Sequence, residues 1–328
     1  MMNLRLTTVA LVGGVALATL MPAASTVAQP KKLCTTRLTV SQVADVGASC
    51  RLAPNSVVTL AGELQIAVPG PGITANVSAL RTRPSTGPTQ LSVYRSSTDQ
   101  VVVQVDDEPF LGSPSGVAEW QKSTAAGTAT VVSPRTAQVA AAAPSWCGSV
   151  GQFRTHPGRW PNAKYSWTYN SRTQPDSGAL DAIFLGFKFI TDNASACSSS
   201  YPTAATHSYR GSTTRYTWGT QDNGNVVGWA GFGLDTLALA YWWTDGSVKL
   251  EADVAFNNRI TNWSTSPAGT VPSNRYDVIS VATHEAGHVF GLEHVDSLPK
   301  QVMYPSFATG ENRRVKRMGD LGGMWAMY

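Results

Sequence analysis

The chain has 328 residues, of which 14% are charged, and its formal net charge at pH 7 is +4. This length allows one large domain or two modest ones with a buried core. The weak positive charge gives no sign of a nucleic-acid-binding surface. The one dense basic run, at 313–317, is short, and we interpret it as a solvated loop or helix face.

The first 28 residues have the pattern of a secretory signal peptide. Arg5 gives a positive start, residues 9–21 form an uncharged apolar run, and Thr26 and Ala28 are placed as in a cleavage site, with Ala24 as a second candidate. The run is shorter than the roughly 20 apolar residues that cross a bilayer. No later segment is long and apolar enough. We therefore expect a secreted, extracellular protein with no membrane or nucleic-acid partner.

The sequence contains four cysteines: Cys34, Cys50, Cys147 and Cys197. An even number in an oxidising compartment suggests two disulfides, for which the sequence allows three pairings. We favour Cys34–Cys50 and Cys147–Cys197, because each bridge then stays within one of the units proposed below. Free thiols are the alternative.

Residues 29–112 are expected to form a small β-rich unit. Apolar side chains alternate with others over 64–68, which is the period of a half-buried strand. The segments 91–95 and 101–105 flank a polar turn and predict a hairpin.

The composition then changes. Residues 113–145 are rich in Ala, Ser, Thr, Pro and Gly and are predicted to be an exposed linker. Proteases cut preferentially in such segments. Residues 146–328 are expected to form the main domain.

Three local patterns organise the main domain. Apolar residues with helical spacing over 179–190 predict a helix capped by Asp176 or Ser177. A hairpin is predicted within 237–256, around a Thr-Asp-Gly turn. Asp277 is placed to cap a further helix, which carries the chemistry.

Residues 284–294 have the sequence H-E-x-x-H-x-x-G-x-x-H. His284 and His288 are four residues apart, so a helix places them on one face. Gly291 can adopt a positive φ and end the helix, which lets His294 return to the same point. The three imidazoles are predicted to bind one zinc ion.

Three protein ligands leave one coordination position for water, as in catalytic rather than structural zinc sites. The ion would activate that water. Glu285, next to the first ligand, would take its proton as general base and pass it to the leaving amine. These roles amount to peptide-bond hydrolysis. Because the motif fixes five positions, a chance meeting of histidines is the weaker alternative.

The stretch 284–294, followed by Val302-Met303-Tyr304-Pro305, resembles the matrixin branch of the metzincins, and in particular its secreted bacterial members. The resemblance extends over most of 160–328. It implies an α/β (α+β) catalytic domain with a twisted mixed sheet, an active-site helix and a C-terminal helix. It also implies that Met303 forms an apolar floor beneath the zinc.

The resemblance further implies where a substrate binds. Residues 237–240 resemble the family's edge strand, which pairs with the substrate backbone, so Ala238 and Leu239 are substrate-binding candidates. Pro305 and Phe307 would line the pocket for the side chain just after the cut. Proteins or peptides are therefore the expected substrates, and we expect a monomer.

Two further groups of residues bear on metal binding. The family's structural zinc needs additional histidines, but only His156 and His207 are left over. We predict no structural zinc, and both histidines are expected to be ordinary surface groups. Oxygen ligands cluster near a glycine at 222–225, where a calcium ion and a plain turn both stay open.

The N-terminal region lacks the family's cysteine-switch motif, because neither Cys34 nor Cys50 has its Pro-Arg-Cys-Gly context. By position, 29 to about 144 is still interpreted as a propeptide that is removed at the linker. A carboxylate from 106–108 could bind the zinc in a latent form, although a solvated turn is the favoured interpretation of that segment.

Two other functions remain open. One is a non-catalytic secreted protein with a metzincin-like fold that binds cell-wall glycan, but such a module has no need of Glu285. The other is a zinc hydrolase with a non-peptide substrate, which the edge-strand likeness disfavours. The glycan-binding alternative is suggested by Trp160, Trp218, Trp229, Trp242 and Trp243.

Overall fold

The computed structural model describes residues 31–60, 64–84, 87–125, 152–196 and 199–328. Residues 32–328 form one compact unit. The predicted signal peptide lies outside the described residues, and so do both cysteines of the predicted second disulfide, Cys147 and Cys197.

The N-terminal region is rich in strands, as its alternating pattern predicts. The predicted strand at 64–68 and the predicted hairpin within 91–105 are confirmed. The elements of this region are β1 (Arg37–Thr39), the short 3-10 helix η1 (Val40–Asp45), β2 (Val57–Leu60), β3 (Leu64–Ala67), β4 (Ile73–Arg81), β5 (Gln90–Arg95), β6 (Val101–Val105) and α1 (Pro114–Ala125).

The C-terminal region combines short and long strands with three α-helices. Its predicted hairpin is confirmed as β12 and β13. The elements are η3 (Pro161–Ala163), β7 (Lys164–Asn170), α2 (Ala179–Thr191), β8 (Ala194–Ala196), β9 (Ser199–Tyr201), β10 (Thr206–Ser212), β11 (Val226–Ala230), β12 (Thr236–Asp245), β13 (Val248–Asn257), β14 (Trp263–Ser264), β15 (Tyr276–Asp277), α3 (Val278–Val289) and α4 (Met318–Met327).

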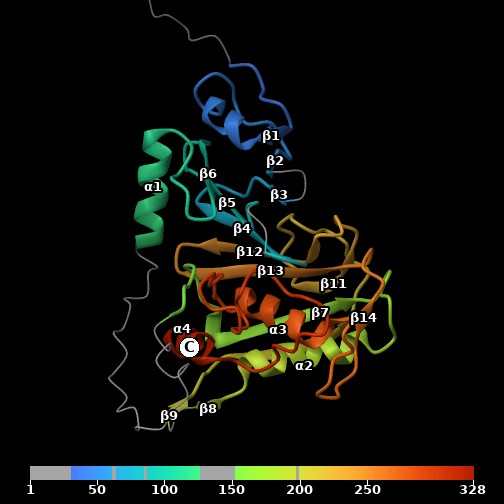
Figure 1. Cartoon of the computed structure of the whole chain (residues 1–328). Helices are drawn as coiled ribbons and strands as arrows, with labels where there is room; N and C mark the ends of the chain where they lie inside the picture. Colours follow the sequence, from blue (N-terminus) through green and yellow to red (C-terminus); the bar gives the residue numbers. More distant parts are fainter. Residues whose placement is uncertain (1–30, 61–63, 85–86, 126–151, 197–198) are drawn as a thin grey trace, which may run out of the picture. The chain divides into compact units, whose positions relative to one another are not determined.

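Eight strands from both regions form one mixed sheet, in the order β10-β7-β11-β13-β12-β4-β5-β6 (Figure 1). The strands from β10 to β13 pair in parallel, and those from β13 to β6 pair antiparallel. The predicted α/β (α+β) class with a mixed sheet is confirmed. Among the described residues, no helix combines the length and apolarity that a bilayer crossing requires.

The strand expected at the edge of the sheet lies in its interior. β12 pairs with β13 on one side and with β4 of the N-terminal region on the other, over almost its whole length. The expectation of a free edge at 237–240 is therefore wrong for this state of the chain. The physical reason is that β4 satisfies the backbone groups that an edge strand leaves unpaired.

The sheet is buried on both faces at β12, because its side chains alternate between two cores. Ala238, Ala240 and Trp242 belong to the core that contains α2 and α3. Tyr241 and Trp243 belong to a second core that is built mainly from β1–β6. The N-terminal region therefore covers the sheet face opposite the two helices.

Part of the predicted linker is folded. Residues 114–125 form α1, in which Trp120 is buried and its ring stacks on Tyr94 at a centroid distance of 5.7 Å. The expectation of an exposed linker is wrong for these residues, since one tryptophan provides the apolar anchor that the averaged composition conceals. The rest of the predicted linker lies outside the described residues.

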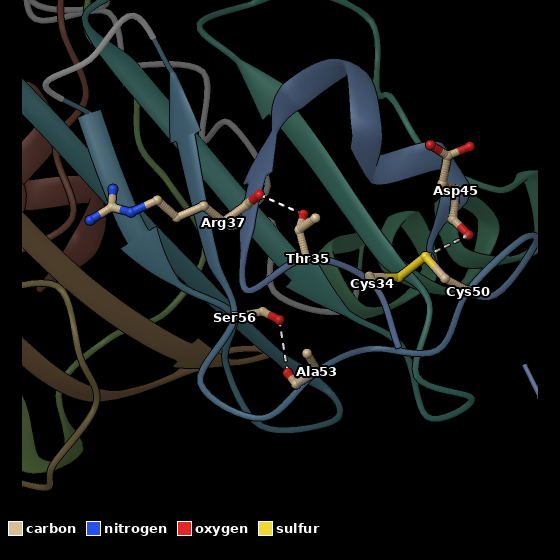
Figure 2. Close-up of a disulfide and its surroundings, with 7 residues drawn as sticks. All are labelled: Cys34, Thr35, Arg37, Asp45, Cys50, Ala53 and Ser56. Atoms are coloured by element: carbon tan, nitrogen blue, oxygen red, sulfur yellow. Dashed lines mark hydrogen bonds between the residues drawn. A yellow bond between two sulfur atoms is a disulfide. The ribbon is translucent and has the colours of Figure 1, made fainter. Parts of the chain in front are cut away.

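The predicted disulfide between Cys34 and Cys50 is confirmed (Figure 2). It joins the segment before β1 to the segment before β2. The bridge closes a loop of the N-terminal region around η1, and Cys50 also lies against the backbone carbonyl of Asp45.

The first predicted helix, α2, begins later than expected. Its N-cap is Gly178, whereas Asp176 accepts a hydrogen bond from the Gly178 amide one step outside the helix. The capping prediction for Asp176 or Ser177 is therefore wrong. The helical spacing over 179–190 is confirmed, and its apolar face packs on α3.

The two helices α2 and α3 approach each other closely at Gly186. A Cβ there would overlap Ala282 and would lie only 2.8 Å from the Thr283 amide nitrogen. Gly186 therefore sets the distance between α2 and the helix that carries the metal motif.

We predict that Gly186→Ala destabilises the protein by about 1–3 kcal/mol, the range for overpacking a filled core. At an open helix position the same change would stabilise by up to about 1 kcal/mol, so the sign itself is informative. The measurement is urea unfolding. Lys188→Ala, on the exposed face of α2, is the control and should change the stability by only a few tenths of a kcal/mol. A neutral or stabilising Gly186→Ala would contradict this packing.

Candidate metal centre

The N-terminus of α3 is fixed by a buried ion pair. Asp277 is the N-cap, as predicted, and its side chain accepts hydrogen bonds from the Ser280 amide and hydroxyl. The same carboxylate receives two hydrogen bonds from Arg314, at 2.7 and 2.8 Å. This bidentate geometry holds the first turn of the helix in place.

The basic run at 313–317 is therefore not a solvated face. Arg313, Arg314 and Lys316 are each about 93% buried. The Arg313 guanidinium lies over the Phe307 ring, and the Lys316 ammonium donates to backbone carbonyls at the end of α2. The expectation of a solvated loop or helix face is wrong because each charge finds carbonyl, carboxylate or ring partners that are remote in sequence.

The C-terminus of α3 follows the prediction. The helix ends at Val289, and Gly291 has a φ of +105°, a value open to glycine but strained for other residues. A Cβ at Gly291 would also overlap Met327. The Leu292 amide donates back to the Gly287 carbonyl, which closes the turn that reverses the chain toward His294.

The three histidines of the motif meet at one point. The Nε2 atom of His294 lies 3.1 Å from that of His284 and 3.2 Å from that of His288. A tetrahedral ion held at about 2.0–2.1 Å from each nitrogen would separate the nitrogens by about 3.3–3.4 Å. The arrangement fits a zinc ion, and it is the metal-binding cluster found among the described residues.

The outer nitrogens determine the protonation state of the cluster. Nδ1 of His284 lies 2.6 Å from the Val302 carbonyl, and Nδ1 of His288 lies 2.8 Å from the Leu292 carbonyl. Carbonyls only accept, so Nδ1 carries the hydrogen and Nε2 presents a lone pair. Burial lowers the pKa of all three imidazoles and favours their neutral form. Lone pairs that face each other this closely need a cation between them.

Glu285 is the other unusual group at this site. It is fully buried, and neither carboxylate oxygen has a hydrogen-bond partner among the described residues. Burial raises its pKa well above the usual value. A buried carboxylate without partners is costly, and in a native structure such a group is explained by strain, by a catalytic role or by a water molecule or ion that binds it.

The predicted methionine turn supports the first ligand. A Cβ at Gly287 would overlap the Met303 sulfur, so this methionine lies directly against α3. The amides of Val302 and Met303 both donate to Asp320 of α4. Asp320 thus holds the turn whose Val302 carbonyl orients His284.

A buried lysine lies at the end of α3. The Lys249 ammonium donates to the carbonyls of His288 and Val289, at 3.0 and 2.7 Å. His156 also bonds to the His288 carbonyl, and Trp160 donates to that of Val289. These donors satisfy carbonyls that a helix end leaves without intrahelical partners.

The two remaining histidines are not alike. His156 is 4% exposed, so its expected place among ordinary surface groups is wrong. It is buried at the end of α3, where its Nε2 lies 2.9 Å from the His288 carbonyl. His207 is half-buried against Trp167 and Phe184.

The substrate-binding candidates lie on two sides of β4. Ala238 and Leu239 are on β12, opposite Leu80 and Ala79 of β4. On the other side, the Pro305 carbonyl accepts from the Arg81 amide, and the Phe307 amide donates to the Arg81 carbonyl. The structure therefore brings the four candidates together around one strand of the N-terminal region.

The remaining candidates have protein partners. Asp107 is paired with Arg154, and Asp106 accepts from the Thr89 and Gln90 amides, so neither belongs to the histidine cluster. In the 222–225 loop, Asp222 accepts from the Gly224 amide and the Thr217 hydroxyl. The turn is therefore held by protein donors, and calcium binding stays a prediction.

A cavity of about 600 Å³ opens beside the cluster. His294 borders it, and much of the remaining wall comes from the N-terminal region, including Asn76, Ser92 and Trp120. The cavity is therefore shared between the two regions of the chain.

Comparison with known proteins agrees with this geometry. The family model described as matrixin matches residues 206–328, which include the whole histidine cluster. In sequence, this chain is matrixin-like. Metalloendoproteinase 2-MMP of Arabidopsis thaliana is 29% identical over 194 residues, which cover 55% of this chain and 46% of that protein. The matrixin-like chain thus spans about half the length of this relative.

Five residues of the matrixin-like site were not predicted from the sequence, which suggested Trp160 only as a glycan-binding candidate. Lys249, Trp160 and Asp320 carry no motif, and each acts on the backbone of a remote segment. Ser78 and Thr89 come from the region interpreted as a propeptide and contact His294. The sequence offers no local signal for any of the five, because each contact depends on tertiary packing.

We predict that Asp320→Asn weakens zinc binding about 10–100-fold, the usual effect of removing an outer partner of a metal ligand. The new asparagine, whose NH₂ group only donates, cannot accept from both the Val302 and the Met303 amide, as the carboxylate does. The methionine turn, and with it the Val302 carbonyl that orients His284, would then lose its fixed position. Unfolding of the metal-free protein should become about 1–3 kcal/mol easier. Competition titration with a zinc chelator measures the first effect. Asp181→Asn, on the exposed side of α2, is the control, and equal zinc affinity in both variants would refute the role of Asp320.

Proposed function

We propose that this protein is a secreted zinc-dependent endopeptidase. The observation that carries the proposal is the convergence of three Nε2 lone pairs, together with Glu285, the residue next to His284, whose fully buried carboxylate has no hydrogen-bond partner among the described residues. His284, His288 and His294 would hold the ion. The matrixin family match over the same residues supports this assignment.

A bound zinc ion would polarise the scissile carbonyl and make water a better nucleophile. Glu285 would accept the proton of the attacking water and then deliver it to the leaving amine nitrogen. Burial raises the pKa of Glu285, which makes its carboxylate a stronger base for the first step. Met303 would keep the floor of the site apolar.

We infer that the substrates are proteins or peptides bound in an extended form. The support is that β12 already pairs with an extended strand, and that residues 305–307 provide a second set of backbone partners. Such strand addition reads main-chain groups and leaves side-chain selection to pockets. Phe307, which is buried in the core that also contains α3 and Met303, would form part of such a pocket.

Export is the setting that we propose for this activity. The disulfide Cys34–Cys50 is compatible with an oxidising compartment, and the signal-like first 28 residues point the same way. We further propose that the N-terminal region is a propeptide.

The glycan-binding alternative is not favoured. Its aromatic platform would need exposed rings, but Trp160, Trp229, Trp242 and Trp243 are buried in the two cores. A non-peptide zinc hydrolase is also less well supported, since it would give no role to the backbone partners along β12.

We expect Glu285→Gln to keep one zinc ion per chain and to lower casein hydrolysis by at least about 10²-fold, the lower bound for a lost general base. The amide has nearly the shape of the carboxylate but little basicity. Both proteins are first given the same limited proteolysis between residues 31 and 152. Zinc is measured by atomic absorption and hydrolysis by release of labelled peptides.

Glu285→Asp provides a matched variant that keeps the charge and moves it by one methylene. It should retain part of the activity that Glu285→Gln loses. Hydrolysis by the Glu285→Gln variant at the rate of an active wild-type protein, with zinc bound in both, would refute the assigned base.

A further inference from the structure

The last residues of β4 lie between two backbone segments that the proposed function assigns to substrate. On one side, Arg81 pairs with Thr236 of β12, and the Thr82 amide donates to the Asp235 carbonyl. On the other side, the Arg81 amide donates to the Pro305 carbonyl at 3.0 Å, and its carbonyl accepts from the Phe307 amide at 2.8 Å. Arg81 thus has backbone partners on both sides.

The direction of this strand is also defined. β4 runs antiparallel to β12 and forms a parallel bridge with Ser306 through Arg81. Its antiparallel neighbour β5 pairs with it only up to Ser78, opposite Gln90. The Ala79 amide still donates to the Thr89 carbonyl, and at Arg81 residues 305–307 take the place of β5. The groove is therefore filled by a single extended segment in one orientation.

The side chains of this segment alternate between the two cores. Val77 and Ala79 face the core of the N-terminal region. Ser78 and Leu80 face the opposite side, as residues two apart in a strand do. The Ser78 hydroxyl lies 3.5 Å from Nε2 of His294, the nitrogen that faces the other two imidazoles.

Leu80 is buried in the same apolar core as residues of the metal-site helix. It is 1% exposed and belongs to the core that includes Ala286 of α3, Met303 and Phe307. A leucine side chain buried this completely contributes strongly to holding its strand in place. The same core contains the residue, Phe307, to which the proposed function assigns the substrate side-chain pocket.

The neighbouring strand contacts the cluster as well. The Thr89 hydroxyl lies 3.2 Å from Nδ1 of His294 and donates to Asp106 at 3.1 Å. Since this hydroxyl gives its hydrogen to the carboxylate, it accepts from Nδ1 of His294. The outer partner of the third imidazole is therefore supplied by the N-terminal region.

We propose that residues 78–82 are an intramolecular substrate mimic, which closes the groove by strand pairing, with Ser78 beside the metal position and Leu80 in the side-chain pocket. This inference rests on the proposed function, which identifies the groove. It assigns the latent state to a strand rather than to a cysteine or a carboxylate ligand. Asp107, considered above for that role, is engaged by Arg154.

Activation then requires more than a cut after α1. β4 pairs with β12 from Thr236 to Asp245 and shares a core with Tyr241 and Trp243. Cutting the chain after α1 breaks none of these contacts. A chain nicked only there keeps its groove closed, and opening requires β4 to be displaced or cut.

The position of Ser78 is tested by Ser78→Cys in the full chain loaded with Co²⁺ in place of zinc. A thiol at this position lies within reach of the ion and becomes a fourth ligand as the thiolate. We expect a thiolate-to-cobalt charge-transfer band in the near ultraviolet, together with tighter cobalt retention against a chelator. Ala79→Cys, one residue along β4 but facing the other core, is the matched control and should give no band.

The outcomes separate the two claims. A band in Ser78→Cys alone supports the proposal. Cobalt bound by both variants with no band in Ser78→Cys, or with equal bands, overturns the strand's position but leaves the proposed function intact. Failure of the wild-type chain to bind cobalt overturns the proposed function, and the inference falls with it.

The closure itself is tested by the association rate of a fluorescent peptide hydroxamate with the zinc-loaded full chain. Truncating Leu80 to alanine should speed association by at least about tenfold. The reason is that the loss of a buried leucine side chain lowers the equilibrium constant for packing the strand by more than about tenfold. Ile66→Ala is the control, because it removes a comparable buried side chain of the N-terminal region outside the helix-facing core.

Circular dichroism and zinc content confirm that both variants are folded and loaded. Faster association with Leu80→Ala than with Ile66→Ala supports a groove closed by β4. Rapid association with the wild type, or the same acceleration in both variants, contradicts it. If Leu80→Ala does not fold, Leu80→Val, which shortens the side chain by one carbon, replaces it with the same expected order of rates.

Discussion

The site depends on one constraint: three neutral imidazoles must aim their lone pairs at a single point. The helix end at Gly291 provides the direction of His294, because a φ of +105° turns the chain back at once. Carbonyls that bond Nδ1 of His284 and His288 fix the remaining two rings. This arrangement is electrostatically unfavourable without a cation, and the packing of α3 against α2 and Met303 maintains it. Metal affinity and fold stability are thereby coupled.

The N-terminal region is built into the same structure. It provides β4, β5 and β6 of the sheet, covers Tyr241 and Trp243, and places Thr89 against His294. A region interpreted from sequence as a removable propeptide thus shares a core with the catalytic part. Its departure would expose two large aromatic side chains on β12. In physical terms the two regions behave as one folding unit, and separating them costs buried apolar area.

What the sequence could predict was local. The metal motif, the Asp277 cap and the hairpin at 237–256 each lie within a few residues, so spacing alone reveals them. What it could not predict depends on distant partners. At the start of β13, alternation would place Val248 and Leu250 inside, yet they are 42% and 39% exposed while Lys249 is buried. The reason is the carbonyl pair at the end of α3, some forty residues away. The pairing of β4 with β12 spans even more of the chain and leaves no periodic signal.

The most direct test of the central claim is X-ray absorption spectroscopy at the zinc edge on the metal-loaded full chain. We predict one zinc ion per chain with three imidazole nitrogens at about 2.0–2.1 Å. Replacing His294 with alanine should reduce that number to two. Fewer than three imidazoles in the wild-type spectrum, or a spectrum unchanged by the loss of His294, would contradict the account.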